Sequence, residues 1–435
     1  MIVAMAAGAS AQTLVDGSLS VSGVYTSGPA LNSPTGFVFI GPNDLLITEK
    51  ATGEVCRMTG GVVQGTVANV SVNNNSERGL LGIVLDPEFA TNNYVYVYYT
   101  WSGDSNPAND YSDSTVDRNR IARFTWNPSA GSFGALENEV EIIALPVLNG
   151  PNHDGGVIIW GPPSAPAASQ KLYAVIGDLN RSGQNQNNSS GGVSDDSGVI
   201  LRLEVSKGVV PTVTWVADNP FVSVPGANDS LRRTYAYGVR NSYGILFDPL
   251  SSAPSTLWIT ENGPSAYDEI NVVAAGFNSG WKNNMGPLSA GYFAGNNGSV
   301  GNFHTFGGLG TYSDPEFSFQ SPIGITAAAI ISNSALGAAY QGDMIVGDVN
   351  TGRLYKFEMN GTRTGFALSN PALTDLVYGT GDSAALSEIQ FGSGFGAVTD
   401  MKQGPDGALY VLTFSSSNRL LRISGPSSVG GWEAM

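Results

Sequence analysis

Polar residues that could do acid–base chemistry stand beside apolar, strand-like segments of the chain. His153, one of two histidines, precedes an apolar run in "PNHDGGVIIW", and Asp178 ends the strand pair that follows, in "YAVIGD". An imidazole titrates close to neutral pH and therefore suits a general base. A loop histidine is more often structural, however, and Asp178 could simply cap a turn, so both interpretations stay open.

Further polar residues occupy matching places one strand pair later. Arg240 and Asn241 precede an apolar run in "YGVRNSYGILF", and the pair that begins there ends in "TENGPSAYDEIN", with Asn262, Gly263 and Pro264. Polar groups at equivalent places in successive units converge if the units surround one axis. Taken singly, the arginine could pair with a carboxylate, and "ENGP" could be only a turn.

Several other chemistries find no support in the chain. No G-x-S-x-G, phosphate-binding P-loop or H-E-x-x-H pattern occurs, and two histidines cannot make a histidine-rich metal site. Cys56 is the single cysteine, so a disulfide or a cysteine-based zinc site is excluded, and we interpret it as a small strand residue. His304, in "GNFHTFGG", is interpreted as loop structure. Calcium stays open because it takes carbonyl and carboxylate oxygens.

One unit, an apolar strand, a polar turn and a second apolar strand, occurs six times. The units begin at Gly36, Leu81, Gly156, Gly244, Gly324 and Ala397. Radial stacking of such units leaves only short, protected edges. We therefore predict an all-β, six-bladed β-propeller in one domain, with a pair of β-sandwiches as the alternative. Insertions are expected around 101–135 and 282–312, and a surface loop at 181–198.

The two ends of the chain differ from the repeated units. The apolar start, with "ASA" before Gln12, resembles a signal-peptidase site without a basic segment before it. We expect a leader and N-terminal extension over 1–25, the propeller over 26–425 and a disordered tail over 426–435. The expected location is therefore secreted or periplasmic.

Charge and hydropathy narrow the classes of partner. The chain has 20 Lys and Arg against 36 Asp and Glu, for a net charge of -16. Such a surface repels phosphate backbones, so we expect no nucleic-acid partner. No segment approaches the roughly 18 apolar residues that a membrane span needs, so no membrane insertion is expected.

Five motifs in order resemble the soluble quinoprotein glucose/sorbosone dehydrogenase family. They are "ERGLLGIVLDPEFATNNYVYVYYT", "NHDGG…LYAVIGD", "YGVRNSYGILFDP", "TENGPSAYDEIN" and "QGPDGALYVLT", and the likeness spans roughly residues 30–425. Members of that family are six-bladed propellers that use pyrroloquinoline quinone (PQQ) and calcium. The resemblance therefore implies both cofactors and a small-molecule sugar as substrate.

The resemblance also implies roles on the sugar side of the site. His153 matches the general base that takes the proton of the sugar's anomeric hydroxyl while hydride passes to the quinone. Asp178 matches a carboxylate that supports this base and contacts the sugar, and Glu77 falls at a polar position near the sugar.

On the cofactor side, Arg240 and Asn241 match residues that reach the quinone oxygens, and Arg240 would stabilise charge on the reduced ring. Asn262 stands where a glutamine is familiar. Gly263 and Pro264 match the pair whose backbone carbonyls hold the PQQ-bound calcium.

Some cofactor-anchoring positions depart from the family pattern. Asn350 replaces a lysine, Ala397 and Thr399 replace two arginines, and Phe319 stands for a tryptophan lid. PQQ carries three carboxylates, and burying unpaired charge costs several kcal/mol per ion. Arg353 or Lys402 could substitute as a cation.

Three functions compete on this evidence. The first is an exported PQQ- and calcium-dependent aldose dehydrogenase that passes electrons to a soluble acceptor. The second is a propeller of the same family that has lost PQQ and binds a carbohydrate or a protein. The third is a hydrolase or lactonase of another six-bladed class, which needs a carboxylate-rich calcium centre and a histidine dyad that two distant histidines hardly supply.

Overall fold

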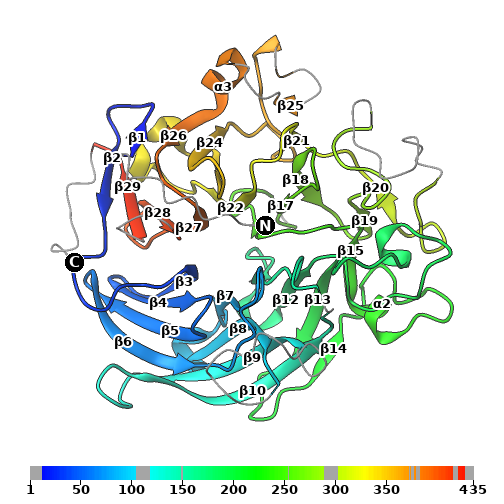
Figure 1. Cartoon of the computed structure of the whole chain (residues 1–435), viewed down its shortest axis with the longest axis horizontal. Coiled ribbons are helices and arrows are strands. Elements are labelled where there is room, and N and C mark those ends of the chain that lie inside the picture. Colours follow the sequence, from blue (N-terminus) through cyan, green and yellow to red (C-terminus); the bar gives the residue numbers. More distant parts are fainter. Residues whose placement is uncertain are drawn as a thin grey trace.

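The computed structural model describes residues 12–103, 118–147, 150–252, 254–288, 302–371, 373, 377–378, 383–414 and 420–426. Within these ranges the chain forms six hydrogen-bonded sheets arranged around a centre (Figure 1). Residues 104–117 and 289–301, which are parts of the two expected insertions, and most of the expected C-terminal tail lie outside the described residues. The expected insertion over 101–135 is wrong for residues 118–127, because they form a regular strand, β9 (Arg118–Asn127), that pairs with β8 (Tyr94–Trp101).

The first three sheets follow one another along the chain. The first contains β3 (Pro34–Gly41), β4 (Asp44–Glu49), β5 (Glu54–Thr59) and β6 (Val62–Asn69). The second contains β7 (Leu80–Leu85), β8 (Tyr94–Trp101), β9 (Arg118–Asn127) and β10 (Ala135–Leu145). The third contains β11 (Ile158–Gly161), β12 (Lys171–Ile176), β13 (Val199–Val205), β14 (Val213–Trp215), β15 (Thr234–Tyr237), β19 (Phe277–Asn278) and β20 (Thr311–Tyr312).

The other three sheets complete the circle. The fourth contains β16 (Gly244–Phe247), β17 (Leu257–Glu261), β18 (Asp268–Val273), β21 (Phe317–Phe319) and β25 (Val377–Tyr378). The fifth contains β22 (Ile325–Ile330), β23 (Met344–Asp348), β24 (Arg353–Phe357), β26 (Gln390–Ser393) and β1 (Thr13–Leu14). The sixth contains β27 (Val398–Gln403), β28 (Leu409–Thr413), β29 (Leu420–Ser424) and β2 (Ser20–Gly23).

Helices are short and lie in the connections. They are α1 (Phe89–Asn92), α2 (Asp229–Arg233), α3 (Ser383–Ile389) and the 3-10 turns η1 (Ala167–Ser169), η2 (Gln184–Gln186), η4 (Ser334–Leu336) and η5 (Ala338–Tyr340). None of the helices in the described ranges is long and apolar enough to cross a membrane.

The apolar core is divided into layers between neighbouring sheets. Alternate residues of β8 show why: Val95 and Val97 pack towards the first sheet, whereas Tyr96 and Tyr98 pack towards the third. Successive side chains of a strand point to opposite faces, so a strand between two sheets is apolar on both. Equivalent clusters fill the remaining four gaps between sheets around the circle.

The innermost strands contact one another in a closed ring. Each of β3, β7, β11, β16, β22 and β27 touches the next, and β27 touches β3. The prediction of an all-β propeller is confirmed, and the alternative of two β-sandwiches is wrong.

The N-terminal segment belongs to the propeller. β2 pairs antiparallel with β29, so the first part of the chain completes the last sheet, and β1 pairs with β26. The expected start of the propeller at residue 26 is therefore too late. The reason is that short edge strands, with exposed and half-buried side chains, give little apolar signal in a sequence.

Candidate functional site

A cavity of about 920 Å³ is lined by residues of all six inner strands. Most of the predicted site residues line it: Glu77, His153, Arg240, Asn241, Asn262, Gly263, Pro264, Asn350 and Thr399. They lie in loops directly before an inner strand or after the strand next to it, except Thr399, which is in β27. The sequence prediction that these polar positions converge on one axis is correct.

His153 and Asp178 form the closest polar pair at the cavity. His153 is 8% exposed, and its Nδ1 lies 2.5 Å from Oδ1 of Asp178, which is buried behind it. Burial alone raises the pKa of Asp178, but the hydrogen bond and charge interaction with His153, helped by donors from Asn180 and Trp281, outweigh it and lower that pKa. An ionised Asp178 only accepts hydrogen bonds, so Nδ1 of His153 is the donor in this contact, and in the neutral imidazole the lone pair is then on Nε2.

The backbone around His153 is held in an uncommon conformation. His153 has a φ of 64°, in the left-handed region. Gly156 has a φ of 116°, and a Cβ there would lie 2.4 Å from Cβ of Leu81. Between them, the buried carboxylate of Asp154 accepts a 3.0 Å hydrogen bond from Asn119 Nδ2. The "HDGG" motif thus sets the imidazole against the cavity by backbone geometry.

Glu77 joins several loops of the site. Its Oε2 accepts hydrogen bonds from His153 N at 2.6 Å, Asn241 Nδ2 at 3.1 Å and the Tyr243 hydroxyl at 2.5 Å. Asn241 Oδ1 is buried and has no hydrogen-bond partner among the described residues. The carboxylate therefore fixes the backbone of His153 and the amide of Asn241 relative to each other.

Arg240 reaches across to the loop after β17. Its Nη1 donates to the carbonyl oxygens of Asn262 at 2.8 Å and Gly263 at 3.1 Å, and its guanidinium lies 5.3 Å from the Trp281 ring centroid. Within the described part of the chain, its buried Nε has no acceptor. One donor of a cavity-lining cation is thus available to a ligand.

Trp281 is a site residue that the sequence prediction missed. Its indole Nε1 donates a 2.6 Å hydrogen bond to Oδ2 of Asp178. Asn187 Nδ2 donates hydrogen bonds to the Trp281 carbonyl and to Asn278 Oδ1, both at 2.9 Å. Asn187 is buried, so the segment 181–198, predicted as a surface loop, in part packs beneath Trp281 and holds it in place.

The turn at Gly263 is packed too closely for a side chain. A Cβ there would lie 2.1 Å from the carbonyl oxygens of Ala266 and Tyr267. Gly263 N donates to Oδ1 of the buried Asp268, whose Oδ2 accepts from the backbone of Gly324 at 2.6 Å. Burial raises the pKa of Asp268 to about 6 even though these amides lower it. The turn is therefore tied to the neighbouring sheet.

A pair of buried carboxylates lies behind Arg240. Glu261 Oε1 accepts from Arg240 N at 2.6 Å, and Ser279 Oγ donates to Glu261 Oε2 at 2.5 Å and lies 3.5 Å from Glu269 Oε2. Burial raises the pKa of Glu261 to about 7, and burial with the charge of Glu261 raises that of Glu269 well above its usual value. Of this pair, Glu261 holds the Arg240 backbone.

The positions at which this chain lacks the family's lysine and arginine residues differ from one another in their surroundings. Asn350 lines the cavity. Thr399 also lines it but donates to the carbonyls of Pro34 and Leu412. Ala397 is not among the lining residues, and neither is Arg353, one of the two suggested substitutes.

Three cations do line the cavity in the described ranges: Lys50, Arg240 and Lys402. Lys402, the other suggested substitute, forms an ion pair with Asp400. Lys50 was missed in the sequence, although it follows β4 in the way that Asn262 follows β17.

Two aromatic expectations have opposite outcomes. Phe319 is fully buried and packs against Phe317 and Tyr355 inside the fourth and fifth sheets, so its predicted role as a lid is wrong. An apolar aromatic within "FSF" fits a strand interior equally well. His304 packs edge-on against Phe306 and is not among the cavity-lining residues, as expected for loop structure.

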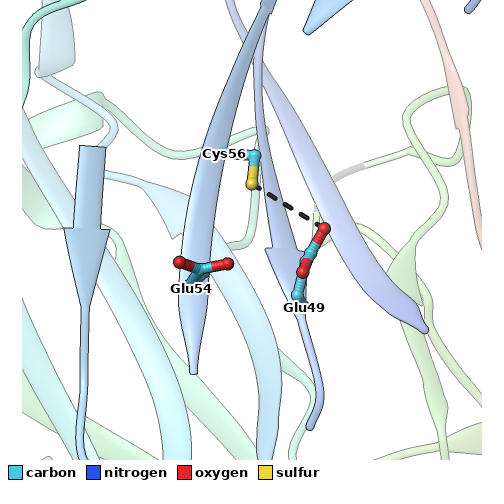
Figure 2. Close-up of side chains that lie close together, drawn as sticks. All are labelled: Glu49, Glu54 and Cys56. Atoms are coloured by element: carbon cyan, nitrogen blue, oxygen red, sulfur yellow. Dashed lines mark hydrogen bonds between the residues drawn. The ribbon is translucent and has the colours of Figure 1, made fainter. Parts of the chain in front are cut away.

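Cys56 belongs to a cluster of three side chains (Figure 2), none of which is among the cavity-lining residues. In the described ranges, Glu49, Glu54 and Cys56 form a group whose potential ligand atoms lie within 4.8 Å of one another. Burial, followed by the charges of Glu49 and Glu54, raises the pKa of Cys56 to about 12. Glu49 already accepts hydrogen bonds from Asn32 N and Thr52 Oγ1. A raised pKa disfavours a reactive thiolate, and Cys56 is buried in β5, as the sequence interpretation of a small strand residue expects.

Comparison with known proteins identifies the family. The model of the "Glucose / Sorbosone dehydrogenase" family matches residues 31–422. A quinoprotein glucose dehydrogenase B of Acinetobacter calcoaceticus is 29% identical over 275 residues, which are 59% of this chain and 51% of the relative. An aldose sugar dehydrogenase of Escherichia coli (strain K12) is 26% identical over 361 residues, 80% of this chain and 78% of the relative. The chain belongs to the glucose/sorbosone dehydrogenase family.

Solved structures agree on the fold. The PQQ-bound aldose sugar dehydrogenase of Streptomyces coelicolor superposes with a TM-score of 0.63 at 21% identity, covering 93% of this chain and 98% of that one. The apo-form of the soluble Escherichia coli enzyme gives a TM-score of 0.65 at 21% identity, covering 94% and 99%. The alignment with the Acinetobacter relative, by contrast, spans about half of that protein's length.

Proposed function

We propose that this protein is a sugar dehydrogenase that oxidises an aldose with PQQ as its cofactor. The observation that carries the proposal is His153 at the cavity wall, with Nδ1 held 2.5 Å from an ionised Asp178. A base in that state can take the proton of a sugar hydroxyl at Nε2. Family membership supplies the reaction class.

Three features support the fit of PQQ to these residues. The cavity volume of about 920 Å³ accommodates a tricyclic cofactor together with a sugar. Among the described residues, the buried Arg240 Nε and Asn241 Oδ1 lack hydrogen-bond partners, and unpaired buried polar atoms are costly unless a ligand satisfies them. Arg240, Asn241 and Asn262 would hold the cofactor, which when bound supplies the acceptor for the hydride of the sugar.

The sugar would lie between the base and Glu77. Oε2 of Glu77 accepts three hydrogen bonds from the site itself, which leaves Oε1 for a sugar hydroxyl. Asp178 acts through His153, which it orients, and through Arg240, whose carbonyl accepts from Asp178 N at 2.8 Å. The proposed division of labour is therefore a base at His153 and substrate recognition at Glu77.

We propose calcium at the backbone carbonyls of Gly263 and Pro264. Both residues line the cavity, and the turn is rigid. The Gly263 carbonyl also accepts a hydrogen bond from Arg240 Nη1, so a calcium ion bound there would lie near the guanidinium group. Two neutral carbonyls are few for an ion that takes six to eight oxygens, so the cofactor would have to supply further ligands.

A second candidate is a propeller of this family that binds a carbohydrate or a protein without PQQ. The observation that favours it is the neutral pair Asn350 and Thr399 at the cavity wall, where the family's basic residues are expected. A hydrolase with a histidine dyad is disfavoured because His304 is not among the cavity-lining residues.

The wider assignment is proposed on the same basis. We propose six blades, one for each sheet in the closed ring of inner strands. We further propose a soluble electron acceptor. The net charge of -16 supports the absence of a nucleic-acid partner, and the apolar N-terminal segment supports a secreted or periplasmic location.

One titration tests the proposal. The protein is titrated with PQQ in the presence of calcium while the cofactor's absorbance is followed, and dye reduction is then measured with a panel of aldoses. The proposed function predicts saturable PQQ binding and aldose-dependent dye reduction that His153→Gln lowers by about 10²–10⁴-fold. Absence of PQQ binding, with sugar binding retained, would favour the cofactor-free propeller.

A further inference from the structure

Lys50 occupies a recurring functional place in the fold. It directly follows β4, as Asn262 directly follows β17, and Asn350 stands two residues beyond β23. All three residues line the central cavity. Residues at this place in the first, fourth and fifth sheets therefore face the same space, and in the first sheet the residue is a cation.

The three described cations that line the cavity differ in how their charge is used. Arg240 donates to two backbone carbonyls, and Lys402 is paired with Asp400. Lys50 Nζ donates one hydrogen bond, to the Asn74 carbonyl at 3.2 Å, and forms no ion pair with a carboxylate of the described residues. An ammonium group has three donors, so two of them stay available.

The negative charges near Lys50 offset only part of the effect that burial has on its ammonium group. Burial lowers the pKa of Lys50 to about 8, while the charges of Glu77 and Asp154 oppose this effect without contacting the ammonium. A desolvated cation without a contacting anion gains strongly from a bound one.

Lys50 lies at the same end of the cavity as the base. Leu80 N donates to the Lys50 carbonyl at 3.1 Å, which ties Lys50 to the segment that carries Glu77. Glu77 in turn accepts from His153 N. Lys402 instead lies within β27, with its ammonium 4.8 Å from the Phe37 ring centroid.

We infer that Lys50 binds a carboxylate group of a ligand in the central cavity, beside Glu77 and His153. The nearby negative charge of Glu77 favours a singly charged carboxylate over a phosphate dianion. This inference rests on the proposed function, and the carboxylate has two sources: PQQ itself, or a sugar acid such as a uronate that the enzyme would oxidise.

Equilibrium binding, measured without turnover, tests the inference. PQQ affinity is followed by absorbance with calcium present, and affinities for glucuronate and glucose are measured by calorimetry. The variants are Lys50→Gln, Lys50→Arg and the control Lys171→Gln, at a lysine that pairs with Glu204 and is not among the cavity-lining residues. If Lys50→Gln unfolds, Lys50→Met takes its place, with thermal unfolding as the check on folding.

Each outcome has a defined meaning. Loss of PQQ affinity by about 10- to 100-fold in Lys50→Gln, recovery in Lys50→Arg and no change in Lys171→Gln supports a cofactor carboxylate. A similar loss for glucuronate, with glucose and PQQ unchanged, supports a sugar acid. If all affinities stay within twofold of the wild-type protein, the role of Lys50 is overturned while the proposed function stands. If the wild-type protein binds neither PQQ nor glucuronate, both are overturned.

Discussion

The indole of Trp281 donates a 2.6 Å hydrogen bond to Asp178, a residue 103 positions earlier in the chain. Together with the 2.5 Å contact from His153, this bond gives each carboxylate oxygen of Asp178 a side-chain donor. Both donors favour the ionised form of Asp178 and oppose the effect of burial. If His153 is the base, as we propose, Trp281 is a positioning residue for it.

Trp281→Phe should slow turnover by about tenfold and shift the acidic limb of the pH profile of kcat/KM upwards. The variant leaves a buried carboxylate oxygen without its donor, which costs about 1–3 kcal/mol. The matched control is Trp258→Phe, because Trp258 is a core indole whose Nε1 has no partner in the described part of the chain. A pH profile that moves equally in both variants would mean that Trp281 is merely structural.

His153→Gln should lower turnover by about 10²–10⁴-fold while PQQ affinity changes little, because glutamine cannot take a proton. Asp178→Asn should give a loss of similar kind, since an amide can donate to Nδ1 and move the imidazole proton to Nε2. Steady-state rates with a dye acceptor and PQQ titrations on the same preparations measure both quantities. Near wild-type rates for His153→Gln would exclude His153 as the base.

The repeated strand pairs could be predicted because their signal is local. Alternation along β8 and its neighbours follows from strands packed on both faces, and polar residues that flank inner strands converge once the sheets form a ring. For this reason His153, Arg240 and Gly263 were found. Lys50 stands at an equivalent place and could have been found by the same rule.

The features of the site that the sequence prediction missed depend on contacts that no local sequence pattern encodes. Trp281 lies in a connection after β19, and its partner Asp178 is distant in sequence. Phe319 was mistaken for a lid because the apolar pattern of a strand is the same at the rim and in the interior, where it packs against Tyr355. The sequence also could not show that Lys402 is paired with Asp400.

Asn350→Lys combined with Thr399→Arg should tighten PQQ binding by about tenfold or more, because both positions line the cavity and each adds a cation for the cofactor's carboxylates. Ala397→Arg is the control, since Ala397 is not a lining residue, and should leave affinity unchanged. Absorbance titration measures the PQQ affinity of the double variant, the control and the wild-type protein. Tighter binding in the control alone would place the anionic groups elsewhere.

Calcium should bind weakly without PQQ and more tightly with it. Gly263 and Pro264 offer neutral carbonyls, and that of Gly263 already accepts from Arg240. Calorimetry of the chelator-treated protein, with and without PQQ, should show at least tenfold stronger calcium binding in its presence. Equally tight calcium binding with and without PQQ would contradict a site at this turn that the cofactor completes.

The folded protein should lose stability as the pH rises from about 5 to 9, and Glu316 should contribute to that loss. Burial raises the pKa of Glu316 from 4.5 to about 8, although the Val272 amide lowers it. The native state thus holds a proton that the unfolded chain releases, so the stabilisation is fully present below about pH 4.5 and is lost as pH rises through about 8.

In Glu316→Gln the melting temperature should fall less steeply over this range, so that the melting temperature of the variant exceeds that of the wild-type protein by a few degrees at pH 9. Glu358→Gln, at an exposed carboxylate, is the control and should follow the wild-type curve. Parallel curves for Glu316→Gln and the wild-type protein would show that Glu316 is ionised in the folded state at neutral pH.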